Sequence, residues 1–110
     1  MRLLRVADYV TVAQLSDVPD GTVRTFYVGM QPVALARVGD EVFAFQDVCT
    51  HDGGPLGSGE LDGYEVECPR HGARFDIKTG AVRAFPAVFG VATYPVRMEG
   101  GAIQVALPED

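Results

Sequence analysis

The chain has 110 residues, 47% of them hydrophobic, and a formal net charge of -6. This length suits one domain with its own apolar core and is too short for a second domain of ordinary size. The negative charge argues against a nucleic-acid partner, because phosphate binding needs clustered Lys and Arg side chains. No stretch approaches the roughly 20 apolar residues that span a bilayer, and charges interrupt the first residues too early for a signal peptide. We therefore expect a soluble cytoplasmic protein with a single domain, residues 1–110.

Short runs of β-branched and aromatic residues, separated by turn signals, predict an all-β fold. In chain order the predicted strands cover residues 9–12, 22–28, 33–38, 41–45, 64–67, 91–98 and 102–107. Residues 12–17 have room for one helical turn before Pro19. Segments such as Pro19-Asp20-Gly21 and Glu99-Gly100-Gly101 favour tight turns between antiparallel strands. Seven strands with short turns indicate a small sandwich or barrel.

Two segments depart from this pattern. Residues 47–63 are rich in Gly, Pro, Asp and Ser, and residues 69–72 form a shorter segment of the same kind. Irregular loops are unusual at this length inside a compact domain unless they carry function. Each loop contains or directly follows a cysteine and also holds a histidine, and together they account for both cysteines and both histidines of the chain.

These residues form two short motifs, Cys49-Thr50-His51 and Cys68-Pro69-Arg70-His71. Two thiolates and two neutral imidazoles make a soft set of ligands, which suits zinc or an iron–sulfur centre and excludes metals that prefer oxygen. Zinc fingers usually pair Cys with Cys and His with His, whereas each loop here pairs a Cys with a His. The alternation favours a dinuclear cluster held between two loops, and a structural zinc module remains as an alternative.

The two motifs, with the following Gly72, resemble the cluster-binding motif of Rieske proteins, most closely that of the small Rieske ferredoxins of bacterial oxygenase systems. The resemblance extends from Val42 to about Leu107 and includes residues 59–63, 75–80 and 85–87. It implies a Rieske-type antiparallel β-sandwich with a small inserted cluster-binding subdomain at about residues 46–82.

The same resemblance implies one Rieske-type [2Fe–2S] cluster per chain. Cys49 and Cys68 would bind a buried iron, and His51 and His71 would bind an outer iron at the solvent edge. The segment 85–87 would correspond to the proline loop that covers the cluster in the family. No histidine is left for a Ser–His–Asp arrangement or for a mononuclear iron site, so we expect an electron carrier and not an enzyme.

The implied function is that of a ferredoxin that carries single electrons from a flavin-dependent reductase to a terminal oxygenase, with nothing that demands more than a monomer. Respiratory Rieske subunits place Ser and Tyr at the positions of Ala73 and Phe75, and those hydroxyls donate hydrogen bonds to the cluster and a ligand sulfur. Their absence here predicts a potential at the low end of the Rieske range of about -150 to +300 mV. An alternative is a small Rieske-like subunit or accessory module of a larger redox enzyme such as a nitrite reductase.

Several acidic residues near the two loops are candidates for contacts with a basic partner surface. They are Asp47, Asp52, Glu60 and Asp62. Scattered carboxylates are more often only a solvated surface, so this docking face is the weaker of the two interpretations.

Overall fold

A computed structural model describes residues 9–51 and 53–108. Within them the backbone forms eleven strands and one short 3₁₀ helix, η1 (Leu15–Asp17). The strands are β1 (Tyr9–Gln14), β2 (Val23–Val28), β3 (Gln31–Val38), β4 (Glu41–Gln46), β5 (Glu60–Asp62), β6 (Glu65–Glu67), β7 (Arg74–Asp76), β8 (Val82–Ala84), β9 (Thr93–Tyr94), β10 (Val96–Glu99) and β11 (Ala102–Ala106). The predicted all-β fold class is confirmed. In this part of the chain, no helix has the length and apolar character needed to cross a membrane.

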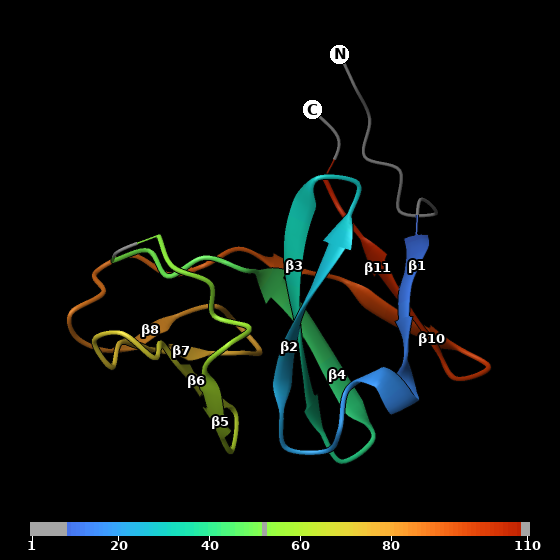
Figure 1. The fold of residues 1–110 in the computed structure, drawn as a ribbon, viewed down its shortest axis with the longest axis horizontal. Helices are drawn as coiled ribbons and strands as arrows, with labels where there is room; N and C mark the ends of the chain where they lie inside the picture. The colour runs from blue at the N-terminus through green and yellow to red at the C-terminus, as the bar shows by residue number, and fades with distance from the viewer. Residues whose placement is uncertain (1–8, 52, 109–110) are drawn as a thin grey trace.

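The strands form three antiparallel sheets (Figure 1). The central sheet has the order β2-β3-β4-β9, the second sheet the order β1-β11-β10, and the third sheet the order β5-β6-β7-β8. In Figure 1 the third sheet lies to the left of the central sheet and the second sheet lies to its right. The central sheet therefore separates the second sheet from the third.

The two faces of the central sheet contribute to two hydrophobic cores, because successive side chains along a strand point to opposite faces. On β3, Val33 and Leu35 belong to the core that includes Ile103 of β11. Ala34 and Ala36 belong to the other core, which is shared with the third sheet. β3 is buried on both sides, so its sequence Val33-Ala34-Leu35-Ala36 is apolar throughout instead of alternating.

The core under the third sheet contains both cysteines. Phe75 on β7 and Val66 on β6 are fully buried there with Cys49 and Cys68. Burial of a side chain as large as Phe contributes roughly 1.5–3 kcal/mol. The segments around the cysteines are thus anchored by the same apolar packing that joins the third sheet to the central one.

The third sheet contains three strands that the sequence pattern does not predict, namely β5, β7 and β8. Each is only three residues long and includes at least one charged side chain. Alternation over so short a segment gives almost no signal. These strands are instead defined by their antiparallel pairing with neighbouring strands, β5 with β6, β7 with β6 and β8 with β7.

The predicted strand over residues 91–98 is wrong as a single element, because it is divided at Pro95. β9 pairs with β4 of the central sheet, whereas β10 pairs with β11 of the second sheet. Pro lacks the N–H that a continuous strand would use, and the Pro95 carbonyl accepts a hydrogen bond from Ala106 at 3.1 Å. The helical turn predicted within residues 12–17 is confirmed as η1, where Gln14 N–H donates to the Asp17 carboxylate at 2.9 Å.

Candidate metal centre

The first loop closes on itself around Cys49, shortly after the end of β4. The Cys49 N–H donates to the Gly54 carbonyl at 2.7 Å, and the Gly53 N–H donates back to the Cys49 carbonyl at 2.7 Å. Gly53 has a φ of 78°, a left-handed conformation that glycine adopts without steric cost. The result is a tight backbone ring that places the buried Cys49 side chain on the core side.

The second loop closes in the same way around Cys68, directly after β6. The Cys68 N–H donates to the Ala73 carbonyl at 2.8 Å, and the Gly72 N–H donates back to the Cys68 carbonyl at 3.1 Å. Gly72 has a φ of 79°. In both loops, therefore, the cysteine bonds to the fifth residue after it and a left-handed glycine stands in fourth place. The sequence alone did not reveal this shared geometry.

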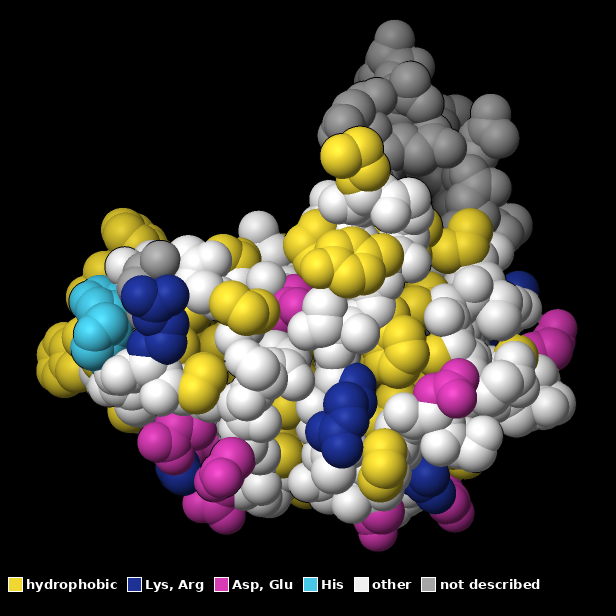
Figure 2. Space-filling view, viewed as in Figure 1, with side chains coloured by type: hydrophobic (Ala, Val, Ile, Leu, Met, Phe, Trp, Pro, Cys, Tyr) yellow, Lys and Arg dark blue, Asp and Glu magenta, His cyan; other side chains and the backbone are white. Residues whose placement is uncertain are grey.

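The side chains of the two motifs divide into an inner and an outer pair. Cys49 and Cys68 have exposed fractions of 0% and 1%, whereas His51 and His71 are exposed. The two imidazole rings lie with centroids 5.1 Å apart and planes at 90°. The structure thus brings together the histidines from both loops, and Figure 2 shows them at one end of the molecule.

The segment after β8 lies against the first loop. Thr50 donates its hydroxyl hydrogen to the Phe89 carbonyl at 2.5 Å, and Ala87 is buried in the same core as both cysteines. Three neighbouring side chains stay largely exposed, Phe85 at 82%, Val88 at 67% and Phe89 at 72%. This placement suits the covering role that the family resemblance implies for residues 85–87, and it adds an apolar surface beside the loops.

Several acidic side chains of the third sheet form ion pairs with one arginine, Arg74. Arg74 lies 3.2 Å from carboxylate oxygens of Asp62, Glu65 and Glu67. The hydrogen bond to Glu67, followed by that to Asp62, raises the pKa of the Arg74 guanidinium. These carboxylates already face a cation within the chain, which weakens the case for Asp62 as a partner contact.

The other acidic candidates behave differently from one another. Asp47 is buried, with an exposed fraction of 6%, and accepts hydrogen bonds from within the fold. Its predicted contact with a partner surface is therefore wrong. Glu60 is exposed, and Asp52 lies outside the described residues.

The donor set fits a two-iron cluster. In residues 9–51 and 53–108, no three or more His, Cys, Asp or Glu side chains are grouped closely enough to hold one metal ion. Two buried thiols and two exposed imidazoles suit a Rieske centre, in which two histidines bind one of the two irons. The arrangement favours a cluster over the structural zinc alternative.

Close backbone approaches that the sequence pattern does not predict hold the first loop in place. A Cβ on Gly57 would lie 1.9 Å from the Thr25 hydroxyl oxygen, and a Cβ on Gly59 would lie 2.1 Å from the Glu67 carbonyl. The first loop thus touches both β2 and the end of β6. The only signal in the sequence is the density of glycine between residues 53 and 59.

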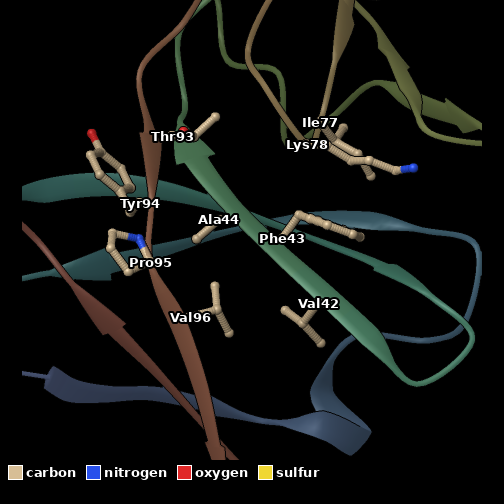
Figure 3. Close-up of a pocket in the computed structure, with 9 residues that line it drawn as sticks. All are labelled: Val42, Phe43, Ala44, Ile77, Lys78, Thr93, Tyr94, Pro95 and Val96. Carbon is tan, nitrogen blue, oxygen red and sulfur yellow. The ribbon is translucent and has the colours of Figure 1, made fainter.

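A pocket on the described surface lies away from the four motif residues. Figure 3 shows its lining side chains, which come from β4, β9, β10 and the turn after β7, among them Phe43, Lys78 and Tyr94. The Lys78 ammonium lies 3.8 Å from the centre of the Tyr64 ring. Burial raises the pKa of Tyr94. This pocket contains no Cys or His, so it is separate from the candidate metal centre.

Comparison with known proteins agrees with this geometry. Residues 8–95 match the family model described as the Rieske [2Fe-2S] domain. The 3-phenylpropionate/cinnamic acid dioxygenase ferredoxin subunit of Shigella flexneri is 42% identical over 97 residues, which cover 86% of this chain and 90% of that protein. The ferredoxin of carbazole 1,9a-dioxygenase from Nocardioides aromaticivorans IC177 superimposes with a TM-score of 0.85 at 38% identity, covering 89% of this chain and 96% of the other.

A further solved structure is a complex of reduced oxygenase and oxidized ferredoxin in carbazole 1,9a-dioxygenase. The matching chain has a TM-score of 0.82 and 37% identity, with 89% of this chain and 92% of that chain covered. The chain therefore belongs to the Rieske [2Fe–2S] domain family. It is a ferredoxin, an electron carrier with a Rieske-type [2Fe–2S] cluster that is not itself the catalytic enzyme. This confirms the electron-carrier role, without catalysis by the chain itself, and the cofactor expected from the sequence.

Proposed function

We propose that Cys49 and Cys68 hold the inner iron of the cluster and that His51 and His71 hold the outer iron, within a cluster-binding subdomain at about residues 46–82. Two observations support this assignment: both cysteines are buried, and the two exposed imidazoles lie next to each other. The cluster, when bound, supplies a centre that takes up and releases one electron. The chain's own residues shield the sulfur side from water and present the imidazole side to a partner.

The electron donor in this proposal is a flavin-dependent reductase, and the acceptor is a terminal oxygenase. The solved complex of an oxygenase with a similar ferredoxin supports the acceptor. Electron transfer weakens steeply with distance, so both partners have to approach the histidine edge. They would use this edge in turn, with the chain as a monomer in the cytoplasm.

The surface beside the histidines favours an apolar contact with the oxygenase. Phe85, Val88 and Phe89 are exposed next to the first loop, to which Thr50 links them. Short-lived electron-transfer interfaces are small, with less than about 1,200 Å² buried in total. A few aromatic side chains at the centre of such an area carry most of the binding energy. Figure 2 shows hydrophobic surface around the histidines, with a basic side chain beside them.

The ligand assignment is tested by the EPR spectrum and metal content of the dithionite-reduced protein, purified without air. We expect two irons per chain and a rhombic signal with an average g value below that of clusters with cysteine ligands alone. Replacing His71 by Cys should preserve iron binding and move the signal toward the all-cysteine type. Stoichiometric zinc without iron would contradict the proposal.

The docking surface is tested with the variant Phe89→Ser in reduction of a terminal oxygenase of the dioxygenase class. We expect the second-order rate of electron transfer to fall several-fold, because the variant removes an exposed aromatic ring and keeps the backbone carbonyl that Thr50 uses. Tyr27→Ser is the matched control, since Tyr27 is 67% exposed on β2. Equal rates for both variants and the unchanged protein would place the docking surface elsewhere.

A further inference from the structure

The carboxylate of Asp47, at the start of the first loop, accepts three hydrogen bonds from within the fold. Its Oδ1 accepts the backbone N–H groups of Leu56 and Gly57, each at 2.7 Å. Its Oδ2 accepts the hydroxyl hydrogen of Thr25 at 2.6 Å. The side chain is almost fully buried, with 6% exposure for the residue, so these hydrogen bonds stand in for the water that a carboxylate would otherwise bind.

These hydrogen bonds join three separate parts of the fold. Thr25 belongs to β2 of the central sheet, Asp47 directly follows β4, and Leu56 and Gly57 lie in the later part of the first loop, before β5. Leu56 is fully buried in the core that contains both cysteines. Because Gly57 has no Cβ, the loop backbone can approach the Thr25 hydroxyl oxygen closely. Asp47 thus fixes the point at which the first loop returns to the central sheet.

The same group places a negative charge close to the cluster. All three of its partners donate a hydrogen to it, so both oxygens of the Asp47 side chain act as acceptors. Asp47 stands two residues before Cys49, so their Cα atoms are at most about 7 Å apart. A buried charge is screened by salt much less than a surface charge. Adding an electron to the cluster is therefore disfavoured by this carboxylate.

We propose that Asp47 is a positioning residue with two effects: it clamps the first loop to β2, and its charge holds the reduction potential of the cluster low. The inference rests on the proposed assignment of Cys49 as a ligand. Thr25 weakens the effect of Asp47 on the potential, because the hydroxyl hydrogen that it donates to Oδ2 partly offsets the negative charge of the carboxylate. Loss of the Asp47 charge and loss of the Thr25 donor should consequently shift the potential in opposite directions.

The experiment measures the midpoint potential of the iron-loaded protein in the variants Asp47→Asn and Thr25→Val. Asp47→Asn keeps an oxygen acceptor for Leu56 and Gly57 and removes the charge. A unit charge roughly 10 Å away at an effective dielectric constant near 20 changes the reduction equilibrium on the order of tenfold, which equals about 59 mV. We expect a rise of this order for Asp47→Asn, and a smaller fall for Thr25→Val.

Two control variants separate this effect from general damage. Asp40→Asn makes the same change in net charge at a fully exposed side chain of the β3–β4 hairpin, and it should leave the potential unchanged. Thr25→Ser keeps a hydroxyl donor and should restore the potential of the unchanged protein. A purely structural role for Asp47 would weaken folding without producing shifts of opposite sign.

The clamp is measured separately by hydrogen exchange at the amides of Leu56 and Gly57. Exchange should be slow in the unchanged protein and at least tenfold faster in Asp47→Ala. The proposal is wrong if Asp47→Asn has the same potential as Asp40→Asn, if both test variants shift in one direction, or if Asp47→Ala keeps full amide protection. A protein that lacks iron would contradict the ligand assignment, whereas the amide measurement would still report on the clamp.

Discussion

The two loops that carry the motif residues have the same backbone closure but different support. In each, a cysteine N–H bonds to the fifth residue onward and a left-handed glycine bonds back. The second loop is the tip of a hairpin, because it lies between the paired strands β6 and β7. The first loop lies between β4 and β5, which belong to different sheets. It relies on contacts with Thr25 and Phe89 from other parts of the chain, and on the bonds that Asp47 at its own start makes to Thr25 and Leu56.

The difference shows two routes to the same local geometry. A hairpin tip is held by strand pairing on both sides, so neighbouring residues in the sequence are enough to form it. A loop between sheets has no such pairing and needs tertiary hydrogen bonds and close backbone approaches. We therefore expect the first loop to be the more sensitive one to distant substitutions, and the two loops to be equally sensitive to changes at their shared positions.

The largest effect is expected for Gly59→Ala, which adds a Cβ where the first loop meets β6. That atom would lie 2.1 Å from the Glu67 carbonyl oxygen and 3.2 Å from the Leu56 carbonyl oxygen. Because both are backbone atoms, the strands themselves have to move. We expect a loss of roughly 3 kcal/mol in the free energy of unfolding, measured by urea titration. We also expect faster loss of the cluster, measured by visible absorbance.

The neighbouring variant Ser58→Ala is the control for Gly59→Ala. Ser58 is exposed, and its hydroxyl lies 3.3 Å from the Pro55 carbonyl, so the free energy of unfolding should change by less than about 0.5 kcal/mol. If the Gly59→Ala protein were as stable as Ser58→Ala, the prediction would be wrong, and the backbone of β5 and β6 could shift at little cost in free energy.

Equal effects are expected for Gly53→Ala and Gly72→Ala. Among the described residues, a Cβ on Gly53 meets no atom within 4 Å, and one on Gly72 meets only the Glu67 carboxylate at 3.6 Å. The cost therefore comes from the left-handed backbone alone, roughly 1–2 kcal/mol for each. Asn at either position should cost less, because Asn tolerates this conformation better. Chemical denaturation of the four variants checks this, and a large difference between the loops would argue against their equivalence.

A smaller effect, confined to the potential, is expected for Ala73→Ser. Ala73 is fully buried in the core with both cysteines. A hydroxyl that donates to a sulfur or to the cluster stabilises the reduced form, which carries the more negative charge. We expect a rise of about 59 mV, a tenfold change in the reduction equilibrium, measured by protein-film voltammetry. Val66→Thr, a buried site on β6, is the control, and an equal rise there would point to general polarity instead.

Sequence reasoning reached the parts of this protein that are encoded locally. The long strands β2, β3 and β4 have the apolar content and turn residues that define them without further information. The four motif residues stand out because they are the only Cys and His in the chain. Spacing alone then favoured a dinuclear cluster over zinc.

What the sequence did not reveal depends on tertiary contacts. In the sequence, Asp47 does not differ from an ordinary loop carboxylate. Its role depends on the hydrogen bond from Thr25, which lies more than twenty residues earlier. The strands β5, β7 and β8 are too short for any periodic signal. The Arg74 cluster requires the register that sets Glu67 opposite Arg74. Each of these features is defined by pairing partners that a linear pattern does not specify.

The smallest effect is expected at Asp76, which holds the turn after β7 and thus supports the hairpin of the second loop. Its carboxylate accepts the Lys78 N–H at 2.8 Å and an Arg83 guanidinium N–H at 3.0 Å. Burial raises the pKa of Asp76, but these donors and the Thr79 N–H outweigh it, so the pKa lies below its ordinary value of 3.8. Asp76 therefore stabilises the fold above about that pH, and this contribution is lost as the pH falls through the lowered value.

The variant Asp76→Asn should lower the free energy of unfolding by about 1 kcal/mol at neutral pH. Because the unchanged protein loses the same contribution in acid, the difference between the two should shrink as the pH falls below 3.8, the ordinary value for this carboxyl group. Comparing the two proteins at each pH cancels any acid sensitivity of the cluster that they share. Asp40→Asn, at an exposed carboxylate, should show little difference at any pH. A constant deficit for Asp76→Asn across the whole range would mean that turn geometry, and not the charge of Asp76, supports the second loop.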